Sequence, residues 1–307
     1  EYQGWAQAML ENHIPFETVI TTKLSSADLQ KYSTLILPDV ACMSDNEINE
    51  IREYVRSGGY IVATGRTSQY DETGNKRREP GFTTLFNGDQ GKGKAVYLEG
   101  MPGMEYFVPK IGGGRAGEAG VWKDDRNEDM RDMMIEMITA NQSDPVVKTV
   151  NIDAQIVLIP YYQVSEGYKG ISVHLLNCLG TRHEGMIMTP EDIAYEYTDY
   201  PSPNGFIKNG GKMKIAVRSD EVSKAYLISP DFVEVLSLDF TMNNDYCEVT
   251  IPDLGRYEII YLVTGEKDLI SDILNGAPTT KEFPAIMPFP GADDSTSVKK
   301  TTPAGIL

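Results

Sequence analysis

Residues 64–69 form the turn in which an α/β enzyme would carry a nucleophile, directly after a predicted buried strand at 60–64. The turn reads Thr-Gly-Arg-Thr-Ser-Gln. It holds no cysteine and no G-x-S-x-G pattern, the arrangement that exposes a serine on a sharp strand-to-helix turn. A triad on Ser68 would need a histidine, but His13 ends a predicted helix, His174 alternates with apolar residues on a predicted strand, and His183 lies in a polar loop. We therefore assign no catalytic residue.

Cys42 is the alternative nucleophile, because it follows one predicted strand and precedes a helix that begins near Ser44. A helix N-terminus or a nearby histidine can lower the pKa of a thiol and make it reactive. The simpler interpretation is a small apolar residue at the entry to the helix. Both interpretations stay open on the sequence.

Four polar residues follow the strand at 60–64 and could contact a ligand: Arg66, Gln69, Tyr70 and Asp71. In open α/β sheets, ligands bind beyond the carboxyl ends of the strands. An aromatic ring with bidentate polar groups suits a sugar ring, and an ordered surface loop is the alternative. We treat these four residues as ligand-contact candidates.

A fifth ligand-contact candidate, Trp122, lies in a glycine-rich stretch at 101–125. Its ring could be a sugar platform or an interface anchor, and we favour the interface because aromatic residues are enriched there. The nearby run Gly112–Arg115 has the composition of a phosphate cradle but does not join a strand closely to a helix. It therefore predicts no phosphate site.

The sequence gives little support for a metal site or for catalysis by a pair of carboxylates. The acidic residues number 45, so adjacent pairs such as Asp124-Asp125 and Glu191-Asp192 arise by chance, and both fall in predicted loops. Glycoside hydrolysis needs two carboxylates held about 5–10 Å apart across a sugar, and no spacing singles out such a pair. The three cysteines form no C-x-x-C pair, so we predict no metal, no cofactor and no disulfide framework.

The segment 44–65 shows how the candidate residues are positioned. Ser44 and Glu47 predict a capping box at the start of a helix. Apolar residues follow at spacings of three and four: Ile48, Ile51 and Val55. Gly58 predicts the end of the helix, since glycine takes a left-handed conformation at little cost. A helix that leads straight into a strand is half of a βαβ unit.

Strands alternate with helices up to about residue 144, which predicts a parallel sheet with helices on both faces. The predicted strands are 16–20, 34–37, 60–64 and 95–98. Such a sheet usually opens with a strand, whereas this chain opens in a helix at residues 2–13. The first strand therefore either lies upstream in a longer polypeptide, which we favour, or is supplied by another part of the chain.

From about residue 145 the pattern changes to short alternating strands separated by turns, as in 212–217, where Met213, Ile215 and Val217 alternate with Lys212, Lys214 and Ala216. The predicted strands are 146–150, 154–163, 170–177, 212–217, 224–228, 233–240, 247–251 and 257–263. This predicts an antiparallel β-sandwich at 145–266. Residues 181–211 are a polar insertion, and 267–307, rich in proline, lysine and small polar residues, predict a tail or linker.

Composition excludes several kinds of partner. The net charge is −17, which argues against nucleic acid and anionic membranes, because phosphate binding needs clustered lysine and arginine. No stretch reaches the roughly 18–20 apolar residues of a membrane helix. Neutral or cationic ligands, sugars among them, remain open. The compartment also stays open, a periplasmic or secreted location included.

Several runs of residues resemble a known family. Residues 2–6 (Tyr-Gln-Gly-Trp-Ala), 35–38 (Leu-Ile-Leu-Pro) and 51–59 (Ile-Arg-Glu-Tyr-Val-Arg-Ser-Gly-Gly) resemble the trimerisation domain of family 42 β-galactosidases and related glycoside hydrolases. Residues 91–97 (Gly-Lys-Gly-Lys-Ala-Val-Tyr) are similar to a late strand of that domain. Residues 173–177 (Val-His-Leu-Leu-Asn) are similar to part of the small β-domain that follows it.

The resemblance implies a flavodoxin-like, class I glutamine-amidotransferase-like domain without its nucleophile at 1–144, with its first strand missing, and then the β-sandwich. It also implies a homo-oligomer and an upstream (β/α)₈ barrel of the same polypeptide, which carries the two catalytic carboxylates. This sequence contains no barrel, so no catalytic residue is carried over.

The main hypothesis is therefore a non-catalytic oligomerisation or accessory region of a glycoside hydrolase. A carbohydrate-binding module, and a small-molecule hydrolase or amidotransferase that uses Cys42, are the alternatives.

Overall fold

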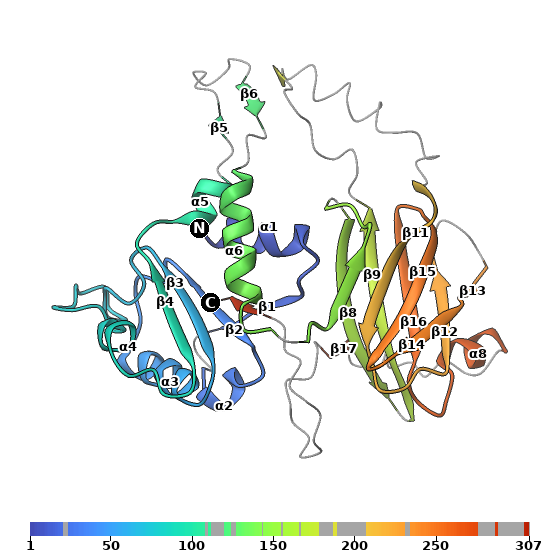
Figure 1. The fold of residues 1–307 in the computed structure, drawn as a ribbon, viewed down its shortest axis with the longest axis horizontal. Coiled ribbons are helices and arrows are strands. Elements are labelled where there is room, and N and C mark those ends of the chain that lie inside the picture. Colours follow the sequence, from blue (N-terminus) through green and yellow to red (C-terminus); the bar gives the residue numbers. More distant parts are fainter. Residues whose placement is uncertain are drawn as a thin grey trace. The chain divides into compact units, whose positions relative to one another are not determined.

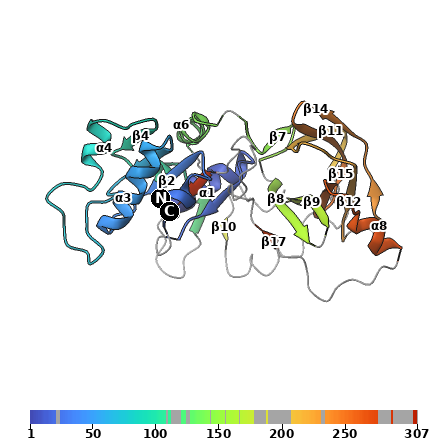
Figure 2. The same ribbon diagram turned by 90° about the horizontal axis from the view of Figure 1, so that it is seen from below.

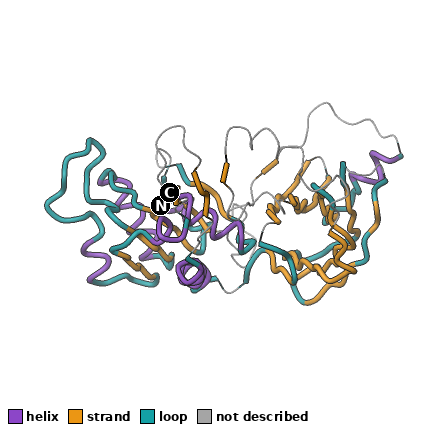
Figure 3. The backbone as a smooth tube through the Cα atoms, turned by 90° about the horizontal axis from the view of Figure 1, so that it is seen from above, coloured by secondary structure: helices purple, strands orange, loops and turns teal. Residues whose placement is uncertain are grey.

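The computed structural model describes residues 1–20, 24–107, 110–111, 120–123, 127–142, 144–154, 156–165, 167–177, 187–188, 207–230, 234–275, 286–287 and 304–306. The chain forms two compact units. Unit 1 comprises Glu1–Val108, Arg126–Val146 and Pro290–Leu307, and unit 2 comprises Pro109–Asp125 and Val147–Phe289. Most described helices belong to unit 1, and unit 2 is made largely of strands (Figure 3), so the chain is rich in β-structure.

The centre of unit 1 is a parallel, 5-stranded sheet in the order β1-β18-β2-β3-β4. Its strands are β1 (Phe16–Thr18), β2 (Thr34–Pro38), β3 (Tyr60–Thr64), β4 (Lys94–Leu98) and β18 (Ala304–Ile306). The helices are α1 (Tyr2–Glu11), α2 (Ser26–Leu29), α3 (Asp45–Arg56), α4 (Thr83–Asn87), α5 (Pro102–Tyr106) and α6 (Glu128–Thr139). Helices α2, α3 and α4 lie on one side of the sheet and α1, α5 and α6 on the other (Figure 1).

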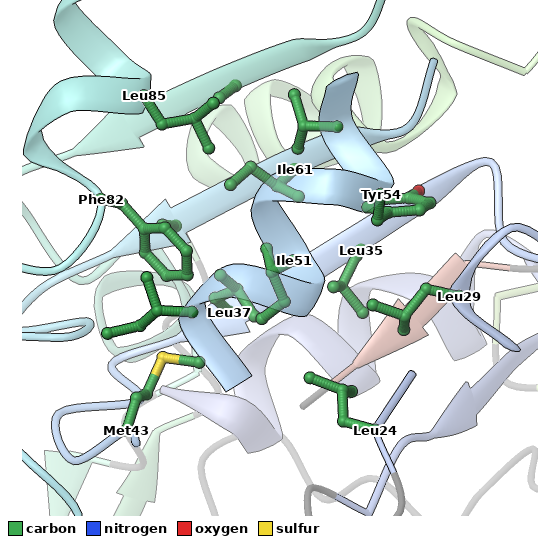
Figure 4. Close-up of a cluster of buried hydrophobic side chains, with 14 of the residues drawn as sticks. Leu24, Leu29, Leu35, Leu37, Met43, Ile51, Tyr54, Ile61, Phe82 and Leu85 are labelled. Carbon is green, nitrogen blue, oxygen red and sulfur yellow. The ribbon is translucent and has the colours of Figure 1, made fainter. Parts of the chain in front are cut away.

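Strand β2 supplies residues to both hydrophobic cores of unit 1, because successive side chains of a strand point to opposite faces. Leu35 and Leu37 pack in one core with Ile51 of α3 (Figure 4). Ile36 packs in the other core with Trp5 of α1. Burying one such side chain contributes roughly 1.5–3 kcal/mol relative to leaving it exposed. The continuous apolar run of β2 therefore requires helices on both faces.

Helix α3 begins and ends as the sequence predicts. The Ser44 hydroxyl accepts a hydrogen bond from Glu47 N, and the Glu47 carboxylate accepts one from Ser44 N, so the capping box is confirmed. At the other end Gly58, with φ +117°, and Gly59 donate back to carbonyls of the last turn. This pair of bonds is the Schellman motif, which satisfies carbonyls that the helix leaves open.

The central position of the sheet is filled by the segment Ala304–Ile306. Strand β18 pairs with β1 through Phe16↔Ala304 and with β2 through Gly305↔Leu35, in parallel in both cases. The sequence favoured an upstream strand for this position and left open another part of the chain. In the structure of residues 1–307 the segment Ala304–Ile306 takes this position, and a strand upstream of Glu1 stays a prediction. The three residues Ala304–Ile306 show no sequence pattern strong enough to predict a strand.

Unit 2 contains two large antiparallel sheets, one 4-stranded in the order β14-β15-β11-β7 and one 6-stranded in the order β13-β12-β16-β9-β8-β17. The strands of the first are β7 (Val147–Val150), β11 (Ile207–Arg218), β14 (Phe240–Asn243) and β15 (Tyr246–Leu254). Those of the second are β8 (Ile156–Ser165), β9 (Tyr168–Asn177), β12 (Lys224–Ile228), β13 (Leu236–Ser237), β16 (Tyr257–Val263) and β17 (Ile286–Met287). Strands β7, β11 and β14 lie opposite β8 and β9 in Figure 2. A small sheet pairs β5 (Lys110–Ile111), β6 (Gly120–Lys123) and β10 (Ile187–Met188).

Burial in unit 2 follows the alternation expected from the sequence. Met213, Ile215 and Val217 of β11 are buried, whereas Lys214 between them is exposed. The strand predicted at 233–240 is different in the structure. Its residues divide between β13, which pairs with β12, and the start of β14, which pairs with β15.

The segment 267–307, for which the sequence predicts a tail or linker, contributes regular structure at three places. They are α8 (Leu269–Leu274), β17 and β18. Ile270 anchors α8 against Tyr226 and Tyr261 of the 6-stranded sheet, and the Asp268 side chain caps the helix. With only six residues, α8 is too short for its apolar spacing to identify it from the sequence.

Candidate functional site

The carboxyl edge of the unit 1 sheet is built from turns in an uncommon backbone conformation. Asp39 after β2 (φ 56°), Gly65 after β3 (φ 57°) and Ser68 (φ 60°) all have positive φ. Asp39 and Ser68 are not glycine, and a residue other than glycine keeps a positive φ only where the surrounding contacts hold it. The Gly65 amide donates to the carbonyls of Leu98 and Gly100, so the turn after β3 is joined to the end of β4.

Asp39 and Arg66 form a clamp across the ends of β2 and β3. Arg66 donates to Asp39 through its backbone N (2.6 Å), its Nε (3.2 Å) and its Nη2 (2.6 Å). Burial alone would raise the pKa of Asp39, but the hydrogen bonds and charge of Arg66 outweigh it and lower that pKa below its usual value. The Arg66 side chain is 57% exposed, so the guanidinium presents a fixed positive charge to solvent.

The hydroxyls of this turn are used internally. Ser68 is buried, and its Oγ accepts a hydrogen bond from Phe82 N at 3.3 Å. Thr67 Oγ1 donates to the carbonyls of Leu37 (3.0 Å) and Thr64 (2.7 Å). Thr67 and Ser68 are both buried, and these hydrogen bonds hold the turn together.

Tyr70 lies beside the Asp39–Arg66 clamp. Its backbone forms a parallel bridge with Cys42, donating to Ala41 O and accepting from Met43 N. Cys42 is exposed.

Asp71 and Gln69 shape the loop around Tyr70. The Asp71 carboxylate accepts hydrogen bonds from Thr73 and Asn75, which lower the pKa of Asp71 to about 2. Gln69 joins the loop ends, since its carbonyl accepts from Arg77 N. Arg66, Gln69, Tyr70 and Asp71 therefore lie in one loop. The Asp71 carboxylate stabilises the turn of this loop through its hydrogen bonds with Thr73 and Asn75.

Other predicted positions lie away from this edge. Trp122 is on β6, where its backbone pairs with Ile111, and its side chain lies outside the described structure. Gly112–Arg115, Asp124-Asp125, Glu191-Asp192, Cys178 and His183 also lie outside the described residues. His174 is half-buried, with Nε2 3.2 Å from Ser172 Oγ and Nδ1 bonded to the Tyr257 hydroxyl, and burial lowers its pKa.

Sequence reasoning missed residues that complete the edge. Asp39 carries half of the clamp, and its position directly after Pro38 at the end of a buried strand could have indicated it. The Tyr97 hydroxyl donates to Gly65 O at 2.6 Å, and Glu1 accepts from Thr64 Oγ1 at 2.9 Å. Nothing in the local sequence marks these contacts, because they join segments far apart in the chain.

The described residues also bear on metal binding and on membrane insertion. They contain no group of three or more histidine, cysteine, aspartate or glutamate side chains placed to hold a metal ion. None of the described helices is both long and apolar enough to cross a membrane.

The fold of unit 1 defines its structural class, a parallel sheet with helices on both faces. Residues 1–87 match the family model described as the β-galactosidase trimerisation domain. The predicted resemblance is therefore confirmed for this segment, which is similar to a non-catalytic, assembly-forming part of such enzymes.

Solved structures of glycoside hydrolases give weaker similarity. The α-L-fucosidase isoenzyme 2 from Paenibacillus thiaminolyticus is 16% identical with a TM-score of 0.49, covering 84% of this chain and 44% of that one. Gan42B, a GH42 β-galactosidase from G. stearothermophilus, is 15% identical with a TM-score of 0.46, covering 86% and 36%. The β-galactosidase from Bacillus circulans sp. alkalophilus is 10% identical with a TM-score of 0.47, covering 85% and 37%.

The chain spans less than half the length of each of these proteins. No curated protein matches it.

Proposed function

We propose that this chain is a non-catalytic oligomerisation and accessory region of a carbohydrate-active enzyme of the family 42 β-galactosidase type. The observation that carries the proposal is the match of residues 1–87 to the trimerisation domain. The buried Ser68 hydroxyl supports it, because the turn that would hold a nucleophile is closed by its own hydrogen bonds. The catalytic carboxylates would then lie on a (β/α)₈ barrel upstream in the same polypeptide.

In this proposal unit 1 is a flavodoxin-like, amidotransferase-like domain at about residues 1–144, and the two antiparallel sheets form a β-sandwich at about 145–266. The alternation of buried and exposed residues along β11 supports the sandwich, since it gives the sheet one apolar face. The exposed Arg66 and the half-buried Tyr70 suit contact with a neighbouring copy or with the barrel, because arginine and tyrosine are enriched in such interfaces.

Activity measurements on the isolated chain test the proposal. The chain alone, offered a panel of chromogenic galactosides, fucosides and glucosides, should release no chromophore above a buffer blank, whereas a version that carries the upstream barrel should be active. Glycoside hydrolysis by the chain alone would contradict the proposal. Its loss in Arg66→Ala or Tyr70→Phe would place the active site in this loop, and its survival would place the active site elsewhere in the chain.

Carbohydrate binding is a second candidate function, favoured by a groove in unit 2. The groove has a volume of about 780 Å³ and lies on the 4-stranded sheet, beside the segment that joins β13 to β14. Among its lining residues are Lys214, Asp239, Phe240, Glu248 and Thr250. Hydroxyl, amine, carboxylate and aromatic groups in one open groove suit a neutral polyhydroxylated ligand.

Titration calorimetry with soluble oligosaccharides tests this second function. Glu248 is the most informative position, because its Oε1 is held by Asn243 Nδ2 at 3.0 Å and so is fixed in place. Glu248→Gln should weaken saccharide binding by about tenfold. Glu72→Gln, in an exposed loop of unit 1, is the matched control. If Glu248→Gln and Glu72→Gln bind the saccharide equally well, the groove is not the binding site.

A further inference from the structure

Strand β4 forms one edge of the parallel sheet in unit 1 (Figure 1). It pairs with β3 along its whole length and has no second strand partner among the described residues. Toward β3, the Lys94 amide donates to Gly59 O at 3.0 Å and the Leu98 carbonyl accepts from Gly65 N at 3.1 Å. Successive residues of a strand turn their amides and carbonyls to opposite sides. Ala95, the residue after Lys94, therefore presents its N–H and C=O to the outer edge.

The side chain of Gln90 binds both of these backbone groups. Its Oε1 accepts from Ala95 N at 3.0 Å, and its Nε2 donates to Ala95 O at 3.1 Å. Two hydrogen bonds exchanged with one residue are the pattern of a hydrogen-bonded pair in an antiparallel ladder. The carboxamide of Gln90 thus lies where the backbone of an added strand would lie.

Gln90 is also held from its other side. Its Nε2 donates to Leu85 O of α4 at 3.3 Å, so both N–H groups of the carboxamide are used. Ala95 is buried and Gln90 is half-buried, which makes the bonds between them poorly accessible to water. The exposed Lys94 at the start of β4 adds a second feature that discourages strand pairing, because a charged side chain at an edge is costly to cover.

We propose that Gln90 blocks strand addition at the β4 edge, so that copies of this chain do not join sheet to sheet there. The partner that it excludes is an extended strand of a second copy. An edge with open amides and carbonyls is a template for such pairing, and head-to-tail pairing has no natural end, unlike a closed oligomer. The proposal does not rest on the oligomerisation proposed above, since it concerns a contact that copies avoid.

Hydrogen exchange tests the block at the backbone. Gln90→Met keeps a side chain of similar length but removes its donors and acceptor. At a protein concentration too low for association, the Ala95 amide of this variant should exchange at least about fivefold faster than in the unsubstituted chain. The Val96 amide should change little, because its place in the ladder directs it toward β3. An unchanged Ala95 amide would overturn the proposal.

Sedimentation velocity tests the consequence for assembly. As the protein concentration rises, Gln90→Met should form species larger than any that the unsubstituted chain forms, and the Ala95 amide should regain protection in them. Asn87→Met is the matched control, because it adds the same apolar side chain at an exposed position of α4, and it should behave as the unsubstituted chain.

Three results of the sedimentation experiment would overturn the proposal. The first is a Gln90→Met chain with the same masses as the unsubstituted chain. The second is a set of larger species in which the Ala95 amide stays unprotected. The third is the formation of larger species by Asn87→Met as well, which would assign the effect to the added methionine.

The unsubstituted chain gives a test that does not require a variant to fold. A fluorescent peptide with the sequence of residues 93–99, which copies β4, should cause no rise in anisotropy when the chain is added. Binding of this peptide with a further slowing of exchange at the Ala95 amide would show that the edge is open, and it would overturn the proposal whatever the oligomeric state of the chain.

Discussion

Replacing Gly59 with alanine tests how α3 is joined to β3. An alanine Cβ at this position would lie 2.3 Å from Cζ of Tyr54, far inside the contact distance of two carbon atoms. The Tyr54 ring cannot move away freely, because it is fully buried and its hydroxyl donates to Tyr32 O at 3.0 Å. The same hydroxyl accepts from Tyr60 N at 3.3 Å, so any shift of the ring also disturbs the first residue of β3.

The expected cost follows from these contacts. Overpacking a buried site costs about 1–3 kcal/mol, and each hydrogen bond lost from the Tyr54 hydroxyl adds about 1 kcal/mol. We expect Gly59→Ala to lower the free energy of unfolding of unit 1 by about 2–4 kcal/mol. Gly58→Ala is the matched control, since nothing lies within 4 Å of its Cβ and only its φ of +117° is unfavourable. That strain costs about 1–2 kcal/mol.

Urea unfolding followed by tryptophan fluorescence measures the effect. The chain has 2 tryptophans, so a Trp122→Phe background leaves only Trp5, which is buried in unit 1. A second measurement in a Tyr54→Leu background removes the ring atoms that the new Cβ would meet, and there the Gly59→Ala penalty should fall below about 1 kcal/mol. A penalty that is unchanged by Tyr54→Leu would refute the contact argument.

Three further predictions concern unit 1 and the cysteines. Hydrogen bonds from Arg66 hold the pKa of Asp39 below its usual value. The clamp should therefore stabilise unit 1 at pH values above the unfolded-state pKa, and this contribution should be lost as the pH falls through the lower folded-state pKa. In urea unfolding between pH 7 and pH 2, the free energy of unfolding should depend less on pH for Asp39→Asn than for the unsubstituted chain. Ser44→Ala removes the cap of α3 and should cost about 1 kcal/mol in the same assay, while Ser44→Asp should cost less. Iodoacetamide at pH 8 should modify the exposed Cys42 before Cys247, because burial raises the pKa of Cys247 to about 12; mass spectrometry of timed digests showing Cys247 modified first would contradict this.

Local patterns predicted the elements of both units that consecutive residues determine. The capping box at Ser44 and the apolar stripe of α3 are each set within one or two turns of chain, and both are confirmed. The alternation of Met213, Ile215 and Val217 likewise determines which face of β11 is buried. Patterns of this kind are readable because each neighbour along the chain contributes to the same element.

Contacts between distant segments were not predictable in the same way. The clamp joins Asp39 to Arg66 across two strand ends, and its geometry depends on the parallel register of β2 and β3. Strand β18 depends on a gap that other parts of the chain create, and its own three residues carry no strand pattern. The four loop residues 66 and 69–71 lie after β3, where the sequence placed them, because strand ends can be located from the sequence. Their role as ligand contacts stays a prediction.

The mass of the isolated chain in solution tests the central claim most directly. Sedimentation equilibrium should give the mass of a trimer. The association should strengthen as salt rises from about 20 to 200 mM, because copies with a net charge of −17 repel one another less when screened. A chain that stays monomeric at all salt concentrations, at protein concentrations well into the micromolar range, would contradict the assignment of this region to oligomerisation.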